Sequence, residues 1–261
     1  MNNKLLDNDI YLEEENHKYI LKDNPDFQFS SVTEFIHDFF EPFDRVGIAQ
    51  NLIKRSPKYR GKKIDEVLAE WDKGARRGTI VHNQIEDFIK NEKYPDFNNE
   101  HSYMSNTAID WIKYVRNKQP DLELHSEVIV YSKKLAIAGT IDLLIYDKEK
   151  NLYHIVDWKT NKKINKKPFG NKVGITDASQ HIEDCNFNHY ALQLSFYKYI
   201  LESCYNLEVG KLRLFHIKDR VFWWKRDRND KGFELIEDEK NKGISDRADD
   251  IVNMLREKEL I

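Results

Sequence analysis

The chain has 261 residues, of which 40% are hydrophobic and 12% aromatic, and this composition excludes a disordered protein. Two cysteines are too few for a four-cysteine zinc or iron–sulfur site, so we expect no iron–sulfur cluster. The net charge of −3 argues against a uniformly basic surface. The first residues lack the apolar core of a signal peptide and no apolar run approaches membrane-spanning length, so we expect a cytoplasmic protein with no membrane partner.

Residues 1–118 are predicted to be mostly helical. Weak alternation over 11–21 first indicates a strand or a hairpin. Ser31 and Glu34 then have the spacing of a capping box, which predicts a helix start, and helical pieces are expected up to Lys54, before a Ser-Pro step. Apolar residues at helical spacing predict further separate helices over 64–71, 78–90 and 106–117.

The pattern changes to strands in residues 119–204, the predicted catalytic core. Three apolar runs bounded by polar turns predict consecutive strands over 122–131, 136–146 and 152–158. A polar loop over 160–186 and a helix over 188–204 follow. This order predicts a single α/β domain with a mixed central β-sheet flanked by helices.

Residues 205–261 are expected to add a strand pair and a terminal helix. The strands are predicted over 212–217 and 221–225, and the helix over 245–258. The aromatic and cationic residues of 222–226 fit an edge strand packed on the sheet, although they would also suit stacking on bases.

Two acids and a lysine on neighbouring predicted strands are the most informative residues. Asp142 lies in one apolar run, and Asp157 and Lys159 end the next, after a polar hairpin turn. Two carboxylates can hold a hard divalent cation, and a lysine beside them can reach the water on that metal. A structural ion pair or a turn-anchoring aspartate is the alternative, but an unpaired carboxylate is costly among the apolar neighbours of Asp142.

Further polar residues have spacings that could bring them to the same site. His82 and Glu86 are four residues apart on one helix face, as are Gln193 and Tyr197 on a later helix, and Glu127 lies inside the first strand of the trio. Each has an ordinary alternative, as a surface residue, a core histidine or part of a polar helix stripe.

These residues occur in the order seen in RecB-type nucleases of the PD-(D/E)XK superfamily, which the chain resembles over residues 30–200. The matching elements are His82-x3-Glu86, Glu127, Gly139-x2-Asp142, Asp157-x-Lys159 and Gln193-x3-Tyr197. Arg77-Gly78-Thr79 is also similar to that branch. Ser31-Val32-Thr33 resembles phage exonucleases and the mitochondrial genome-maintenance exonuclease. No proline precedes Asp142, so the literal Pro-Asp is missing, although Gly-x-x-Asp is usual in the RecB-type branch.

The resemblance implies a restriction-endonuclease-like fold and a Mg²⁺ or Mn²⁺ site. The implied metal ligands are His82, Asp142, Asp157 and the backbone carbonyl of Trp158, with Glu86 or Glu127 as a further candidate. The implied catalytic residues are Glu127, Asp142, Asp157, Lys159, Gln193 and Tyr197. Lys159 would orient or deprotonate the attacking water, Gln193 would hold Lys159 or that water, and Tyr197 would contact the phosphate backbone.

Glu127 and Glu86 are the less defined members of the implied site. Glu127 would bind a second metal or position a water, and Glu86 would accept a hydrogen bond that orients His82.

Basic residues gather in two acid-free segments despite the negative net charge. Residues 45–63 contain seven lysines and arginines, and residues 158–176 contain six lysines. Such segments either bind nucleic acid or only keep the protein soluble. The second begins at the Asp-x-Lys motif, which favours a nucleic-acid role. The predicted nucleic-acid contacts are Arg77, Lys162, Lys163, Lys166, Lys167 and Tyr197.

The sequence therefore predicts a metal-dependent DNA nuclease, and the resemblance implies an exonuclease acting on single strands or on DNA ends. A structure-specific endonuclease or resolvase is one alternative, and a non-cleaving nucleic-acid-binding protein is another. No Walker motif is present, so no nucleotide cofactor is expected and any helicase or recombination partner would be a separate protein.

Overall fold

The computed structural model describes residues 5, 9–218, 232–237 and 246–261, and a six-stranded mixed sheet lies at its centre. The strand order is β3-β5-β6-β7-β8, and β4 pairs with β5 as well. The pairs β3–β5 and β6–β7 are parallel, and the other pairs are antiparallel. The strands are β3 (Ser30–Ser31), β4 (Leu122–Ser132), β5 (Ile137–Asp147), β6 (Leu152–Lys159), β7 (Val209–Ile217) and β8 (Phe233–Glu237). The predicted mixed α/β sheet is confirmed.

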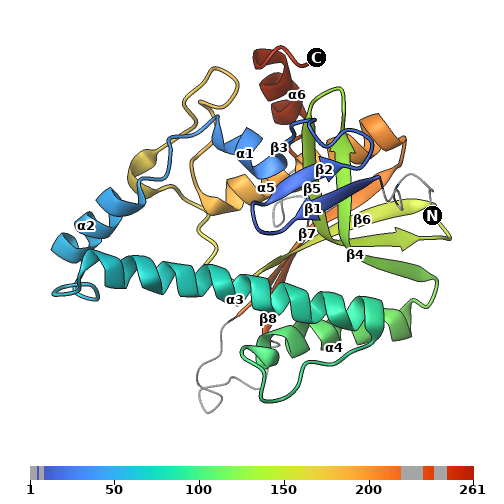
Figure 1. Cartoon of the computed structure of the whole chain (residues 1–261), viewed down its shortest axis with the longest axis horizontal. Coiled ribbons are helices and arrows are strands. Elements are labelled where there is room, and N and C mark those ends of the chain that lie inside the picture. Colours follow the sequence, from blue (N-terminus) through green and yellow to red (C-terminus); the bar gives the residue numbers. More distant parts are fainter. Residues whose placement is uncertain (1–4, 6–8, 219–231, 238–245) are drawn as a thin grey trace.

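Helices cover both faces of this sheet (Figure 1). One face packs against α3 (Ile64–Asn91) and α4 (Ser102–Lys118), and the other against α1 (Val32–His37), α5 (Asn186–Tyr205) and α6 (Ala248–Glu257). Successive side chains of a strand point to opposite faces. Trp158 of β6 therefore packs on the α3–α4 side, whereas Ile155 packs on the α5 side. The same alternation directs Asp157 and Lys159 toward α5.

Helix α3 is one helix of 28 residues, so the prediction of separate helices over 64–71 and 78–90 is wrong. The intervening residues 72–77 are polar and mostly exposed, and they give no apolar period from which a helix could be predicted. Helical hydrogen bonding nevertheless continues through them. The predicted helix over 106–117 is α4, which begins four residues earlier. Helix α2 (Arg45–Arg55) lies between α1 and the start of α3 (Figure 1).

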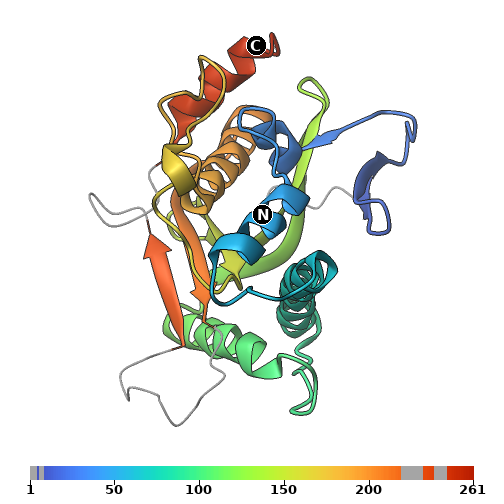
Figure 2. The same ribbon diagram turned by 90° about the vertical axis from the view of Figure 1, so that its left-hand side faces the viewer.

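The predicted N-terminal hairpin and helix cap are both present. Strands β1 (Ile10–Glu13) and β2 (Lys18–Leu21) pair antiparallel, and the hairpin lies at the side of the molecule (Figure 2). The Glu34 backbone N–H donates to Ser31 Oγ at 3.1 Å, and the Ser31 backbone N–H donates to the Glu34 carboxylate at 2.8 Å. This is the capping box that the sequence predicts for α1.

The C-terminal part agrees with the prediction in its first strand and its last helix. The strand predicted over 221–225 and the aromatic cluster of 222–226 lie outside the described residues. Strand β8, which the sequence did not predict, pairs with β7. The loop after β6 contains a short helical turn, η2 (Phe169–Asn171).

Across the described ranges of the chain, every helix is too short or too polar to cross a lipid bilayer.

Candidate active site

The candidate site lies where one edge of β5 changes partner. Residues Ile137 and Ala138 of β5 pair with β3, whereas Leu143 to Asp147 pair with β6. The four residues between these pairings, 139–142, leave a fork between β3 and β6. Asp142 lies at the mouth of this fork, where the β5–β6 ladder has ended.

The carboxylate of Asp142 connects β5 to β6 and to α3. The backbone N–H of Trp158 donates to Asp142 Oδ2 at 2.8 Å. His82 Nε2 lies 3.0 Å from the Trp158 carbonyl oxygen, and because that oxygen can only accept, Nε2 carries the proton. In the neutral ring, Nδ1 then offers a lone pair, and it lies 3.6 Å from Asp142 Oδ1. His82 Nδ1 and Asp142 Oδ1 thus lie near each other, and each has a lone pair that could bind a metal ion.

Glu127 completes this group from β4. The β4–β5 pairs on either side place Glu127 opposite Asp142, and its φ of 51° is a left-handed conformation that costs energy for a residue with a side chain. Ligand atoms of His82, Glu127 and Asp142 all lie within 4.8 Å of one another. Burial, together with the negative charge of Asp142, raises the pKa of Glu127 to about 8.

Asp157 and Lys159 form an ion pair beside this group. Lys159 Nζ lies 2.6 Å from Asp157 Oδ2, and Asp157 is only 3% exposed. Burial raises the pKa of Asp157 to about 6, although the Lys159 charge opposes this rise. Burial acts to lower the pKa of Lys159, but the charges of Asp157 and Asp142 outweigh it and hold that pKa above its ordinary value. Lys159 is therefore a cation at neutral pH in the metal-free protein.

Helix α5 holds Lys159 through Gln193. Lys159 Nζ donates to Gln193 Oε1 at 3.5 Å, and Gln193 Nε2 donates to the Tyr197 hydroxyl at 3.1 Å. Tyr197 is 3% exposed, and a Cβ on Gly139 would lie 2.6 Å from its ring. Gly139 of the motif thus leaves room for Tyr197. Such burial suits a residue that supports Gln193, and it does not fit the phosphate contact predicted for Tyr197.

Two tyrosines that the sequence reasoning missed also border the site. The Tyr190 ring lies 4.5 Å from Lys159 Nζ, and its hydroxyl donates to Asn161 Oδ1 at 3.0 Å. Tyr190 is three residues before Gln193, so helical spacing could have placed it on the same face. Tyr19 of the hairpin makes a 3.0 Å hydrogen bond with Thr140. No local sequence signal indicates that the hairpin folds back onto β5.

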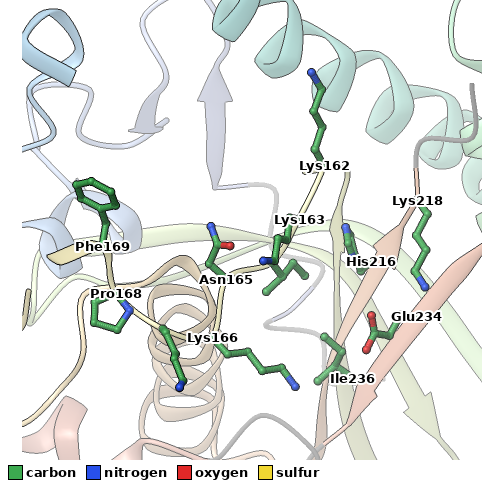
Figure 3. Close-up of a pocket in the computed structure, with 12 residues that line it drawn as sticks. Lys162, Lys163, Asn165, Lys166, Pro168, Phe169, His216, Lys218, Glu234 and Ile236 are labelled. Carbon is green, nitrogen blue, oxygen red and sulfur yellow. The ribbon is translucent and has the colours of Figure 1, made fainter. Parts of the chain in front are cut away.

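The remaining predicted site residues lie at the margin. The described partners of the two His82 nitrogens are Trp158 and Asp142, whereas Glu86 forms an ion pair with Lys90, so the orienting role predicted for Glu86 is not seen. Arg77 Nη2 donates to the Thr160 carbonyl oxygen at 2.9 Å and thereby ties α3 to the end of β6. The four predicted lysines, Lys162, Lys163, Lys166 and Lys167, line a neighbouring cavity of about 1110 Å³ (Figure 3).

The donors at the fork fit a divalent cation. One imidazole and two carboxylates are directed at a common point, and the pKa of Glu127 is raised first by burial and then by the negative charges of Asp142 and Glu86. A divalent cation would offset these negative charges, and this mixture of nitrogen and oxygen donors is suitable for Mg²⁺ or Mn²⁺. Asp157 lies next to the group, close enough for its charge to act on Glu127.

The chain has similarity to solved structures and to one protein-family profile. Among solved structures, a candidate exonuclease from Eubacterium rectale shares 15% identity at a TM-score of 0.45, over 95% of this chain and 85% of that chain. The protein SSO0001 shares 14% identity at a TM-score of 0.37, over 89% of this chain and 75% of that chain. No curated protein matches the sequence. The sequence profile of the PD-(D/E)XK nuclease superfamily matches residues 16–257, and the chain therefore belongs to that superfamily.

Proposed function

We propose that the protein is a metal-dependent deoxyribonuclease that acts as an exonuclease on single strands or DNA ends. The observation that carries the proposal is the position of one partly buried, charged lysine, Lys159, beside the metal-ligating group of His82, Glu127 and Asp142. The exonuclease part rests on the resemblance to phage exonucleases and to the mitochondrial genome-maintenance exonuclease.

His82, Glu127 and Asp142 would hold Mg²⁺ or Mn²⁺, with Asp157 and the Trp158 carbonyl as further ligands. The carbonyl oxygen that accepts from His82 has a second lone pair, so the two roles are compatible. When bound, such a cation polarises the scissile phosphate and lowers the pKa of a water molecule.

The protein's own groups supply the positioning. Lys159 remains charged because of Asp157 and Asp142, so it is suited to orient the attacking water and to stabilise negative charge on the phosphate. Gln193 fixes the direction of the ammonium, and Tyr197 fixes which end of the Gln193 amide faces it. The side chain of Lys159 would thereby be preorganised before the substrate binds.

Two substitutions test the site. Asp142→Asn and Lys159→Ala should each lower cleavage of end-labelled DNA in Mg²⁺ or Mn²⁺ by roughly 100-fold or more, because each removes a group from the reacting centre. Binding of the same DNA in EDTA should remain. Lys150→Ala is the matched control, since Lys150 lies on the β5–β6 turn and pairs with Asp147. Unchanged cleavage by either purified site variant would show that the substituted residue is not part of the active site.

The mode of cleavage is tested with modified ends. Single strands blocked at the 5′ end, at the 3′ end or closed into circles should be compared with open strands. An exonuclease leaves circles intact and is stopped by one of the two blocks. Cleavage of circles would indicate an endonuclease, and binding without metal-dependent products would indicate a non-cleaving protein.

A further inference from the structure

A second charged feature lies one strand away from the candidate active site. Lys159 of β6 is the register partner of His216 on β7, and His216 lines the 1110 Å³ cavity. Neighbouring strands are about 4.8 Å apart, so the wall of the cavity begins next to the catalytic lysine. Figure 3 shows that its side chains come from the loop after β6 and from the β7–β8 pair.

The lining of the cavity is strongly cationic. Among the described residues that line it, five are lysines and Glu234 is the single acid. The lysines are Lys162, Lys163, Lys166, Lys167 and Lys218. Pockets for small ligands measure about 300–1,000 Å³. A larger cavity lined by this many ammonium groups fits a polyanion instead.

The loop that carries these lysines is held in place by its backbone. His216 Nε2 bonds to the Asn161 carbonyl oxygen at 2.7 Å. The Asn165 N–H donates to Asn186 Oδ1 at 2.7 Å, and the Phe187 N–H donates to the Asn165 carbonyl oxygen at 3.2 Å. Both ends of the 161–165 segment are therefore fixed, to β7 and to the start of α5. Lys162 and Lys163 therefore extend from a backbone segment that is fixed at both ends.

The cavity also contains an exposed aromatic residue, Phe169, whose presence is not explained by phosphate binding alone. Phe169 lines the same cavity from η2, yet it is 89% exposed, so it contributes little to the core. An aromatic ring beside phosphate-binding lysines is the arrangement on which unpaired bases stack. In a duplex the base faces are already covered by their neighbours, so only an unpaired strand could use this ring.

We propose that this cavity is a binding site for unpaired nucleic acid, in which Phe169 stacks on a base while the lysines bind phosphates. The inference rests on the proposed nuclease function and deepens it, because it identifies an unpaired strand as the segment held beside the active site. It also makes Phe169 a specificity-determining residue.

The test compares Phe169→Ala with the matched control Phe97→Ala. Phe97 is an equally exposed phenylalanine, at 90%, in the loop between α3 and α4. Binding of a fluorescent single-stranded 15-mer and of its duplex is measured by anisotropy in EDTA, so that no cleavage occurs. Phe169→Ala should weaken single-strand binding by roughly 5- to 150-fold and leave duplex binding unchanged. Phe97→Ala should change neither, and Phe169→Trp should retain single-strand binding.

A lysine variant separates the two kinds of contact. Lys167→Ala should make the negative slope of log K against log salt shallower by about 0.7 for the single strand, because one phosphate contact is lost, whereas Phe169→Ala should leave that slope unchanged. Equal weakening of single-strand and duplex binding by Phe169→Ala, or no weakening, would overturn the inference, as would a wild-type protein that does not bind the single strand. Because binding is measured without metal, these outcomes are independent of whether the protein cleaves DNA.

Discussion

At the scale of single residues, the direction of Lys159 depends on contacts from α5. Gln193 accepts from the ammonium, and the ring of Tyr190 lies 4.5 Å from it. The Tyr190 hydroxyl is directed away, to Asn161, at the start of the loop after β6. Tyr190 is therefore a positioning residue, and its ring rather than its hydroxyl acts on the lysine.

Tyr190→Leu should lower kcat by roughly tenfold, because a partly buried cation–π contact contributes about 1–2 kcal/mol. Tyr190→Phe keeps the ring and should retain most of the activity. Steady-state cleavage and DNA binding in EDTA are measured for both variants, together with thermal unfolding. If Phe and Leu reduce kcat equally while binding and folding are kept, the hydroxyl and not the ring would be responsible.

Some residues of this site could be predicted from the sequence and others could not. The difference is whether a residue is positioned by neighbours in the sequence or by residues far away in the sequence. Asp142 and Lys159 could be expected near each other because a short polar turn joins the two strands that carry them, whereas the metal role of His82 is implied by the resemblance to RecB-type nucleases. The burial of Tyr197 depends on Gly139 of a distant strand, and the place of Tyr190 depends on the loop after β6. These are tertiary contacts, which form only in the folded chain, and no local sequence pattern predicts them.

At the scale of elements, the length of α3 was also hidden from the sequence. Most of the residues between its two apolar parts face solvent, so they show no apolar periodicity, and the two glycines at 74 and 78 resemble helix interruptions. The continuous helix matters for the site because Arg77 bonds to Thr160, and His82 one turn later reaches the Trp158 carbonyl. Both contacts are made from the same rigid element.

Gly74→Ala should stabilise the protein by about 1 kcal/mol, because alanine is the better helix former. Among the described residues, no atom lies within 4 Å of the added Cβ. Chemical denaturation measures the change, and cleavage should be unaffected. Gly139→Ala provides the contrast, since its Cβ would meet the Tyr197 ring, and it should destabilise by about 1–3 kcal/mol. Destabilisation by Gly74→Ala would contradict a continuous, unstrained helix.

At the scale of the whole molecule, opposite charges are separated although the sum is only −3. The carboxylates at the fork lie together and are partly buried, and the lysines of the loop after β6 line a neighbouring cavity. Glu70 of α3 links the two basic segments, with ion pairs to Lys58 and Lys62 of one and Lys162 of the other. We therefore expect the stability of the fold to depend on pH in part through the carboxylates at the fork.

The raised pKa of Glu127 determines whether its contribution to folding stability rises or falls with pH. Its folded pKa of about 8 exceeds its ordinary value of 4.5, so its contribution to stability is complete below pH 4.5 and is lost as pH rises through 8. A divalent cation binds the ionised carboxylate and must displace the remaining proton. The rise in Tm on adding Mg²⁺ should therefore increase from pH 6.5 to 8.5.

Thermal unfolding of the wild type and of Glu127→Gln, with and without Mg²⁺, measures this linkage. The variant lacks the titrating carboxyl, so its metal-free Tm should exceed that of the wild type at pH 8.5, and its Mg²⁺ shift should vary less with pH. His154 does not interfere, because burial and Arg213 hold its pKa near 4, and the stability it contributes is lost only as pH falls from 6.5 toward 4. A Mg²⁺ shift of equal pH dependence in both proteins would show that Glu127 is not the group from which the cation displaces a proton.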